Sequence, residues 1–172
     1  IKEHPYVLLN RGTHVLEPAN ETGWQAEAFL RFNAGHQLTL NASQAENNFP
    51  GRRTIFKELF AEFEYHIDEA TALKLFADRS HDPFKLEEQR NAAGIYFDKE
   101  WTRQWSTVLD VEYQTFERKF TPREQVKNYA LALTLARAPK FSAGVVWERS
   151  TDSQLADNPR TELIETKARH WL

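Results

Sequence analysis

The stretch NYALALTLA, residues 128–136, carries large apolar side chains at every second position. Tyr129, Leu131, Leu133 and Leu135 form one set, and the positions between them hold only Asn, Ala and Thr. Successive side chains of a β-strand point to opposite faces of a sheet. The stretch therefore predicts a strand with one strongly apolar face and one face of small and polar groups.

The same alternation continues from about residue 24 to residue 149 and predicts an all-β chain. Turn-forming or charged residues divide it into ten expected strands, near 5–16, 24–34, 36–45, 53–67, 70–79, 90–98, 104–118, 126–137, 141–149 and 161–171. Tight connections at 33–36, 68–70 and 137–140 are expected to alternate with long ones at 45–52, 78–90, 116–125 and 149–160. Short turns at one end and longer loops at the other are typical of outer-membrane barrels.

Composition excludes several classes of protein. The 172 residues predict one domain over 1–172, or a segment of one, and the absence of Met indicates a mature protein or a piece of a longer one. No apolar run approaches the roughly 18 residues of a transmembrane helix. A net charge of -3 without a basic stripe argues against a nucleic-acid partner, and zero Cys excludes disulfides and thiolate chemistry.

The apolar side chains occupy every second position of each predicted strand, and we call this set the apolar parity. It is expected to face lipid, because its aromatic residues lie towards strand ends with aliphatic residues between them. Trp105 and Tyr113 are eight residues apart, about 26 Å along a strand and roughly 20 Å of depth once the strand is tilted. The predicted membrane-interface aromatics are Trp24, Phe32, Tyr65, Trp105, Tyr113, Tyr129 and Trp147.

The opposite parity is too polar for a dry core, since burying an unpaired ionisable group costs several kcal/mol. We expect it to line a lumen that holds water or a cross-strand charge network. A tight turn at 68–70 would place Glu64 opposite Lys74 and His66 opposite Ala72. The predicted lumen-lining residues are Glu58, Glu62, Glu64, His66, Lys74, Asp110 and Glu112.

Two groups of residues are candidates for a chemical site. His66 shares a predicted strand face with Glu62, Glu64 and Asp68, but one strand rarely supplies a whole metal shell, so a solvated lumen wall is favoured. Ser80, His81 and Glu87 or Glu88 fall in one expected loop, without a spacing that signals a hydrolase. No catalytic residue, metal ligand or cofactor is therefore predicted, and the chain is not expected to be an enzyme.

Residues 50–150 also resemble a known family. The segment KELFAEFEYHIDEATALKLFADRS, the motif around Trp101–Thr107 and the segment APKFSAGVVWE at 138–148 resemble the later strands of large outer-membrane β-barrel proteins of unknown function from Bacteroidota-like bacteria. The resemblance implies a barrel larger than ten strands, of which this chain is a part, and implies no catalytic residues. The end of the chain, Trp171 followed by Leu172, departs from the terminal aromatic residue usual in such barrels.

The sequence thus predicts an antiparallel up-and-down transmembrane β-barrel in a bacterial outer membrane, acting as a passive channel or a structural envelope component. Its expected partners are the lipid bilayer, and other envelope proteins or further strands of the same barrel. A soluble, lipocalin-like ligand-binding barrel is one alternative, although that class requires an apolar inward face. An outer-membrane barrel hydrolase is the other.

Overall fold

The computed structural model describes residues 6, 8, 21–32, 35–49, 52–83, 87–119, 123–152 and 167–171. Alternating side chains make this part of the chain almost entirely strand and turn. The strands are β1 Glu21–Arg31, β2 Gln37–Phe49, β3 Arg52–Asp68, β4 Thr71–Asp82, β5 Glu87–Glu100, β6 Trp105–Arg118, β7 Glu124–Arg137, β8 Phe141–Ser150 and β9 Lys167–Trp171.

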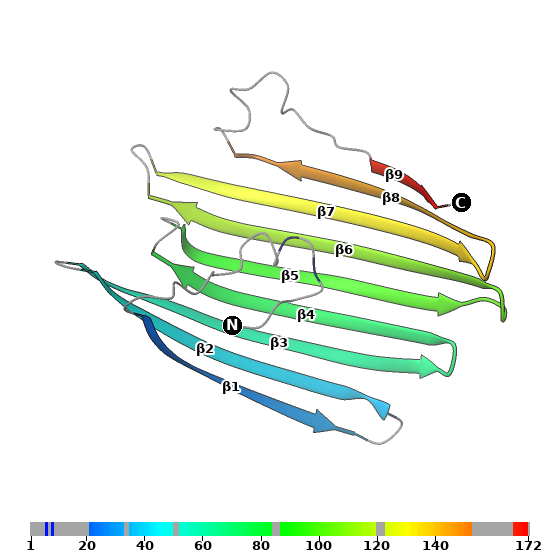
Figure 1. The fold of residues 1–172 in the computed structure, drawn as a ribbon, viewed down its shortest axis with the longest axis horizontal. Coiled ribbons are helices and arrows are strands. Elements are labelled where there is room, and N and C mark those ends of the chain that lie inside the picture. The colour runs from blue at the N-terminus through cyan, green and yellow to red at the C-terminus, as the bar shows by residue number, and fades with distance from the viewer. Residues whose placement is uncertain are drawn as a thin grey trace.

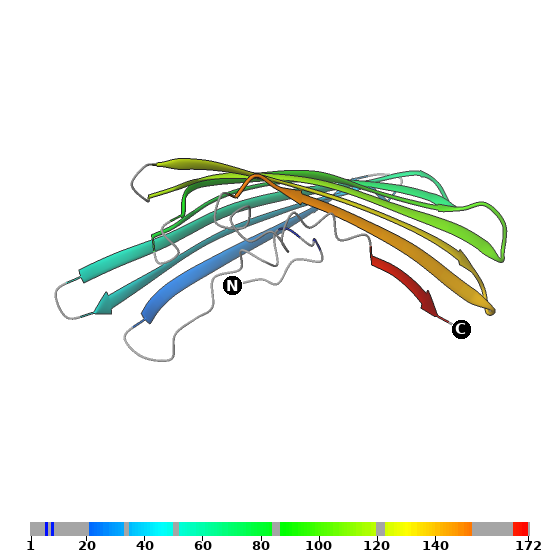
Figure 2. The same cartoon turned by 90° about the horizontal axis from the view of Figure 1, so that it is seen from above.

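All nine strands belong to one antiparallel sheet in which each strand pairs with its neighbours in sequence, from β1 to β9 (Figure 1). Within the described residues, β1 pairs only with β2 and β9 only with β8, so the sheet is open. Figure 2 shows that the sheet is arched, with a convex and a concave face. The all-β, antiparallel, up-and-down prediction is confirmed at this level.

Nine of the ten predicted strands correspond to β1–β9. The strand predicted at 5–16 lies outside the described residues except for Tyr6 and Leu8, which belong to no strand of the sheet. In the tight turn at 69–70, the backbone N–H of Ala70 donates to Asp68. Glu64 pairs with Lys74 and His66 with Ala72, so the predicted register of this hairpin is confirmed.

The prediction of long connections at one end of the sheet is wrong in two places. β2 continues to Phe49 and β3 begins at Arg52, and β4 continues to Asp82 while β5 begins at Glu87. The outer ends of these strand pairs are polar. Between β2 and β3, Arg53 forms an ion pair of 2.5 Å with Glu46, and Asn47 lies opposite Thr54. The polar composition of these segments therefore did not end the strands, because the hydrogen bonds of a β-ladder join backbone groups and do not require apolar side chains.

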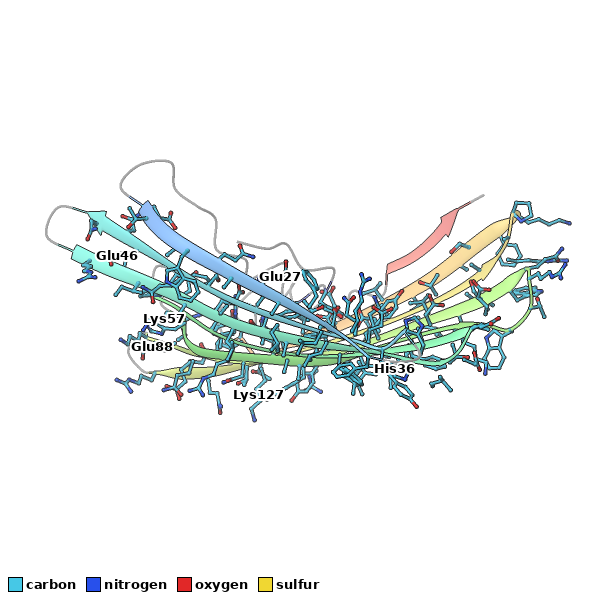
Figure 3. All side chains as sticks on the ribbon, turned by 90° about the horizontal axis from the view of Figure 1, so that it is seen from below. Glu27, His36, Glu46, Lys57, Glu88 and Lys127 are labelled. Carbon is cyan, nitrogen blue, oxygen red and sulfur yellow. The ribbon has the colours of Figure 1, made fainter. Side chains whose placement is uncertain are left out.

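The two faces of the arch differ. With the exception of Phe29, the exposed large apolar side chains of the sheet lie on the convex face, and with the exception of Thr71 its buried residues lie on the concave face. Glu27 lies on the concave side and Lys127 on the convex side in Figure 3. A small core of Tyr6, Phe60, Phe76 and Ala92 packs on the concave face, with Tyr96 against it.

Candidate functional site

The convex face carries an apolar band that crosses eight strands. Its central row, defined by the strand pairing, has no polar member and consists of Leu30, Leu38, Phe63, Leu75, Ile95, Val111, Leu131 and Trp147. A neighbouring row is equally apolar: Tyr65, Leu73, Phe97, Leu109, Leu133 and Val145. Leu59 is 59% exposed and Leu133 is 47% exposed. Continuous exposed apolar surface of this kind marks an interaction with a partner or a membrane.

Basic residues bound the band on both edges, and the edges run obliquely to the strand pairing. Lys57 lies six residues from the central row on β3, whereas Arg149 lies only two residues from it on β8. At the opposite edge, Lys99 lies four residues from the row on β5 and Arg137 six residues from it on β7. Both edges shift in the same direction across the sheet. Tilted strands that cross a flat slab produce such a shift, because a line of constant depth then changes register from strand to strand.

The seven predicted interface aromatics occupy the convex face or its border. Trp24, Phe32, Tyr65, Tyr113 and Tyr129 are exposed, whereas Trp105 and Trp147 are half-buried. Trp105 contacts Phe141 edge-on, with 5.7 Å between the ring centroids, and Arg137 Cζ lies 5.4 Å from the centroid of the Trp105 ring. Tyr113 and Tyr129 face each other across β6 and β7. Trp147 lies in the central row, so it does not mark an edge of the band.

All seven predicted lumen-lining residues lie on the concave face, where they form separate groups. Glu64 contacts His66 at 3.2 Å and Lys74 at 3.4 Å. Glu62 and Glu112 contact the N-terminal residues described below, and Glu58 contacts Arg90. Asp110 lies opposite Tyr96. The structure therefore does not gather the seven residues at one site.

Arg90 is the centre of a buried charge cluster on the concave face. Its side chain is 2% exposed, and its Nε lies 2.7 Å from Ser80 Oγ and 3.9 Å from Asp78 Oδ1. Its guanidinium also lies 4.0 Å from Glu58, which accepts a hydrogen bond from Ser43. Removing the cation of such a cluster leaves buried carboxylates without compensation.

Tyr6 and Leu8 dock on the concave face across the strands. The Tyr6 ring stacks on Phe76 at 3.8 Å, and its hydroxyl donates to Glu62. The backbone N–H of Leu8 donates to Glu112 at 2.7 Å, and Gln114 donates to the Leu8 carbonyl at 3.1 Å. Burial of the phenol and its hydrogen bond to Glu62 raise the pKa of Tyr6, so the phenol is neutral at physiological pH.

The candidate catalytic residues are not brought together. Ser80 and His81 are consecutive residues of β4, so their side chains point to opposite faces. Ser80 is hydrogen-bonded to Arg90, and Glu88 forms an ion pair with Lys119. Among the described residues, no group of three or more His, Asp or Glu side chains is placed to hold a metal ion.

Sequence reasoning gave no site role to Tyr6, Phe60, Phe76, Arg90, Gly94 or Gln114. Phe60 and Phe76 lie on the polar parity, where they interrupt the polar pattern of β3 and β4. Gly94 was the clearest available signal, because glycine inside a strand often marks a close approach of another group. A Cβ atom at Gly94 would lie 2.3 Å from the Phe76 ring.

Comparisons with protein-family models, curated proteins and solved structures found no match to the chain. Within the part of the chain that the structure describes, no helix has the length and apolar character needed to cross a membrane.

Proposed function

We propose that this chain forms part of the wall of an integral outer-membrane β-barrel with a passive role, as a channel or as a structural component of the envelope. The observation that carries the proposal is the apolar band of the convex face, which is continuous over eight strands and bounded by basic residues. The sequence resemblance to large outer-membrane barrels points to the same class of protein and to the same bacterial membrane.

The width of the band fits the hydrocarbon layer of a membrane. On β7 the convex-face residues between Lys127 and Arg137 are Tyr129, Leu131, Leu133 and Leu135. Ten residue steps correspond to about 33 Å along a strand, or roughly 25 Å of depth at a tilt near 40°. Lys and Arg at the two ends can extend their charged groups into the polar headgroup region.

The open sheet requires further strands in this proposal. Unpaired backbone groups at a sheet edge are too costly in hydrocarbon, and only closed barrels avoid them. The outer edges of β1 and β9 would therefore pair with further strands of a longer chain or with another envelope protein. β1 is exposed along almost its whole length, as expected for a strand that lacks a neighbour on one side.

Two rival functions fit the geometry less well. A soluble ligand-binding barrel would turn its apolar face inward, whereas here that face is convex and exposed. A barrel hydrolase would need Ser80 and His81 on one face. The Ser80 hydroxyl oxygen also accepts a hydrogen bond from Arg90 within the buried cluster.

Single-cysteine labelling tests the proposal cleanly, because the chain has no native Cys. Leu133→Cys and Ala132→Cys place a fluorophore on adjacent residues of β7 that point to opposite faces. In vesicles containing lipids brominated along their acyl chains, we expect strong quenching at position 133 and little at position 132. Equal quenching at both positions, or at neither, would overturn the proposal.

Heat-modifiable migration on gels gives a second measurement. Together with the further strands that close its sheet, the membrane-inserted protein is expected to migrate faster before boiling than after it. The same chain kept in buffer without detergent or lipid should show no such shift.

A further inference from the structure

Tyr6 and Leu8 occupy a site that the strands build without them. Phe60 and Phe76 stack on each other at 6.3 Å on β3 and β4. Gln114 on β6 accepts a hydrogen bond from Asn128 at 3.0 Å, and Asn128 in turn accepts one from Ser150 at 2.7 Å. The ring platform and the Gln114 side chain are therefore positioned by contacts within the sheet.

The site has the chemistry of a peptide clamp. Glu112 and Gln114 are two residues apart on β6 and lie on one face, so one accepts from the Leu8 N–H while the other donates to the Leu8 carbonyl. Both backbone groups of a single residue are thus satisfied by side chains. Tyr6 supplies the specificity, because its ring is 2% exposed on the platform and its hydroxyl reaches Glu62.

Gly94 lies between the aromatic platform that holds Tyr6 and the Glu112 side chain that holds Leu8. Glu62, Phe76, Gly94 and Glu112 form one row across β3, β4, β5 and β6. The Phe76 ring occupies the space where a Cβ atom of residue 94 would lie. Glycine at this position therefore lets Phe76 lie over β5 and present its ring to Tyr6.

We propose that the concave face carries a binding site for a peptide with a tyrosine two residues before a clamped amide, and that the chain's own N-terminal segment, through Tyr6 and Leu8, is its exchangeable occupant. Release of Tyr6 and Leu8 would break no strand pairing, because neither residue belongs to a strand. The site does not depend on the proposed function, since its contacts lie on the face opposite the apolar band.

Ala92 provides a reporter for occupancy of the site. It is 5% exposed within the Tyr6, Phe60 and Phe76 cluster. In the full chain carrying Ala92→Cys, we expect slow labelling by a water-soluble maleimide in detergent micelles. Adding Tyr6→Ala should raise the labelling rate roughly tenfold or more, because the substitution removes a buried ring. Tyr65→Ala, which truncates an exposed tyrosine on the convex face, is the matched control and should leave the rate unchanged.

A synthetic peptide then tests binding in trans. The peptide IKEHPYVLLN, residues 1–10, should restore protection of the thiol introduced at position 92 in the chain that carries Tyr6→Ala. The same peptide carrying Tyr6→Ala should not. Unchanged labelling after Tyr6→Ala in a chain that keeps its β-sheet circular dichroism would overturn the inference, as would failure of the native peptide to protect.

Glu112 gives a second pair of variants in case Tyr6→Ala impairs folding. Glu112→Leu removes the acceptor for the Leu8 N–H and should raise labelling at position 92 several-fold. Glu112→Gln keeps an acceptor oxygen and should label close to the parent rate. Equal rates for the two variants would contradict the clamp. Micelle labelling reports only on the concave face, so its outcome is separate from the bilayer quenching test at positions 132 and 133.

Discussion

The convex and concave faces are built from alternate residues of the same strands, yet they are organised differently. On the convex face, the central row changes from Leu to Phe to Val to Trp without changing its character, so depth within the band matters more than residue identity. On the concave face, individual partners matter, as in the contacts of Arg90 and Tyr6. The convex face thus requires only apolar character at a given depth, whereas the concave face requires particular side chains that contact one another.

The largest difference between the faces is expected from two arginines near one another in the register. Arg90→Met removes the cation of the buried cluster and should lower the free energy of unfolding by about 3–5 kcal/mol. Arg79→Met changes an exposed arginine on the convex face, paired with Asn91, and should alter stability by less than about 0.5 kcal/mol. Urea unfolding midpoints measure both. Similar effects at the two positions would remove the distinction between the faces.

An arginine placed in the apolar band tests whether depth governs the convex face. Leu133→Arg should cost about 2–4 kcal/mol in vesicles, whereas Tyr129→Arg, nearer the edge, should cost roughly 0–1 kcal/mol. Reversible unfolding in lipid vesicles gives the two values. A uniform penalty at both depths would contradict a membrane slab.

Gly94 tests how closely the concave face is packed. Gly94→Ala places a methyl group against the Phe76 ring and should cost about 1–3 kcal/mol. Gly144→Ala is the control, because its nearest contact is the Thr134 hydroxyl at 3.2 Å, which can rotate away. Denaturant unfolding should separate the variants. A neutral Gly94→Ala would mean that Phe76 can move at little cost.

The smallest expected effect concerns Lys74. Its ion pair with Glu64 is partly exposed, so Lys74→Met should change the free energy of unfolding by no more than about 1 kcal/mol. The effect should shrink further at high salt. A large loss that is insensitive to salt would show that Lys74 has a role beyond this pair.

Much of the sheet could be predicted from the sequence, because parity is a local signal. A strand is expected over residues 126–137, and β7 covers Glu124–Arg137. Parity also placed Glu58 and Glu112 on the same face. The outer ends of β2, β4 and β5 were missed, since they are polar and the composition there is typical of a loop.

Contacts between residues far apart in sequence could not be predicted. Nothing in the sequence around Tyr6 indicates that its ring stacks on Phe76. The alternation of polar and apolar residues also cannot distinguish a phenylalanine that packs against another ring from one that lines a lumen. The Arg90 cluster combines residues of β3, β4 and β5, and Arg90 itself stands where the expected loop at 78–90 meets the expected strand at 90–98. Gly94 was visible as an interruption of a strand, but the group that approaches it was not.

The docking of the N-terminal residues sets an order of assembly. Every strand pairs with its neighbour along the chain, so the meander can grow one hairpin at a time. Leu8, however, is bonded to residues 104 and 106 positions away. Closing so long a loop is slow and gains nothing until β6 is in place. Tyr6 and Leu8 are therefore expected to dock after the strands that contact them have paired, and their docking reports that the middle of the sheet is complete.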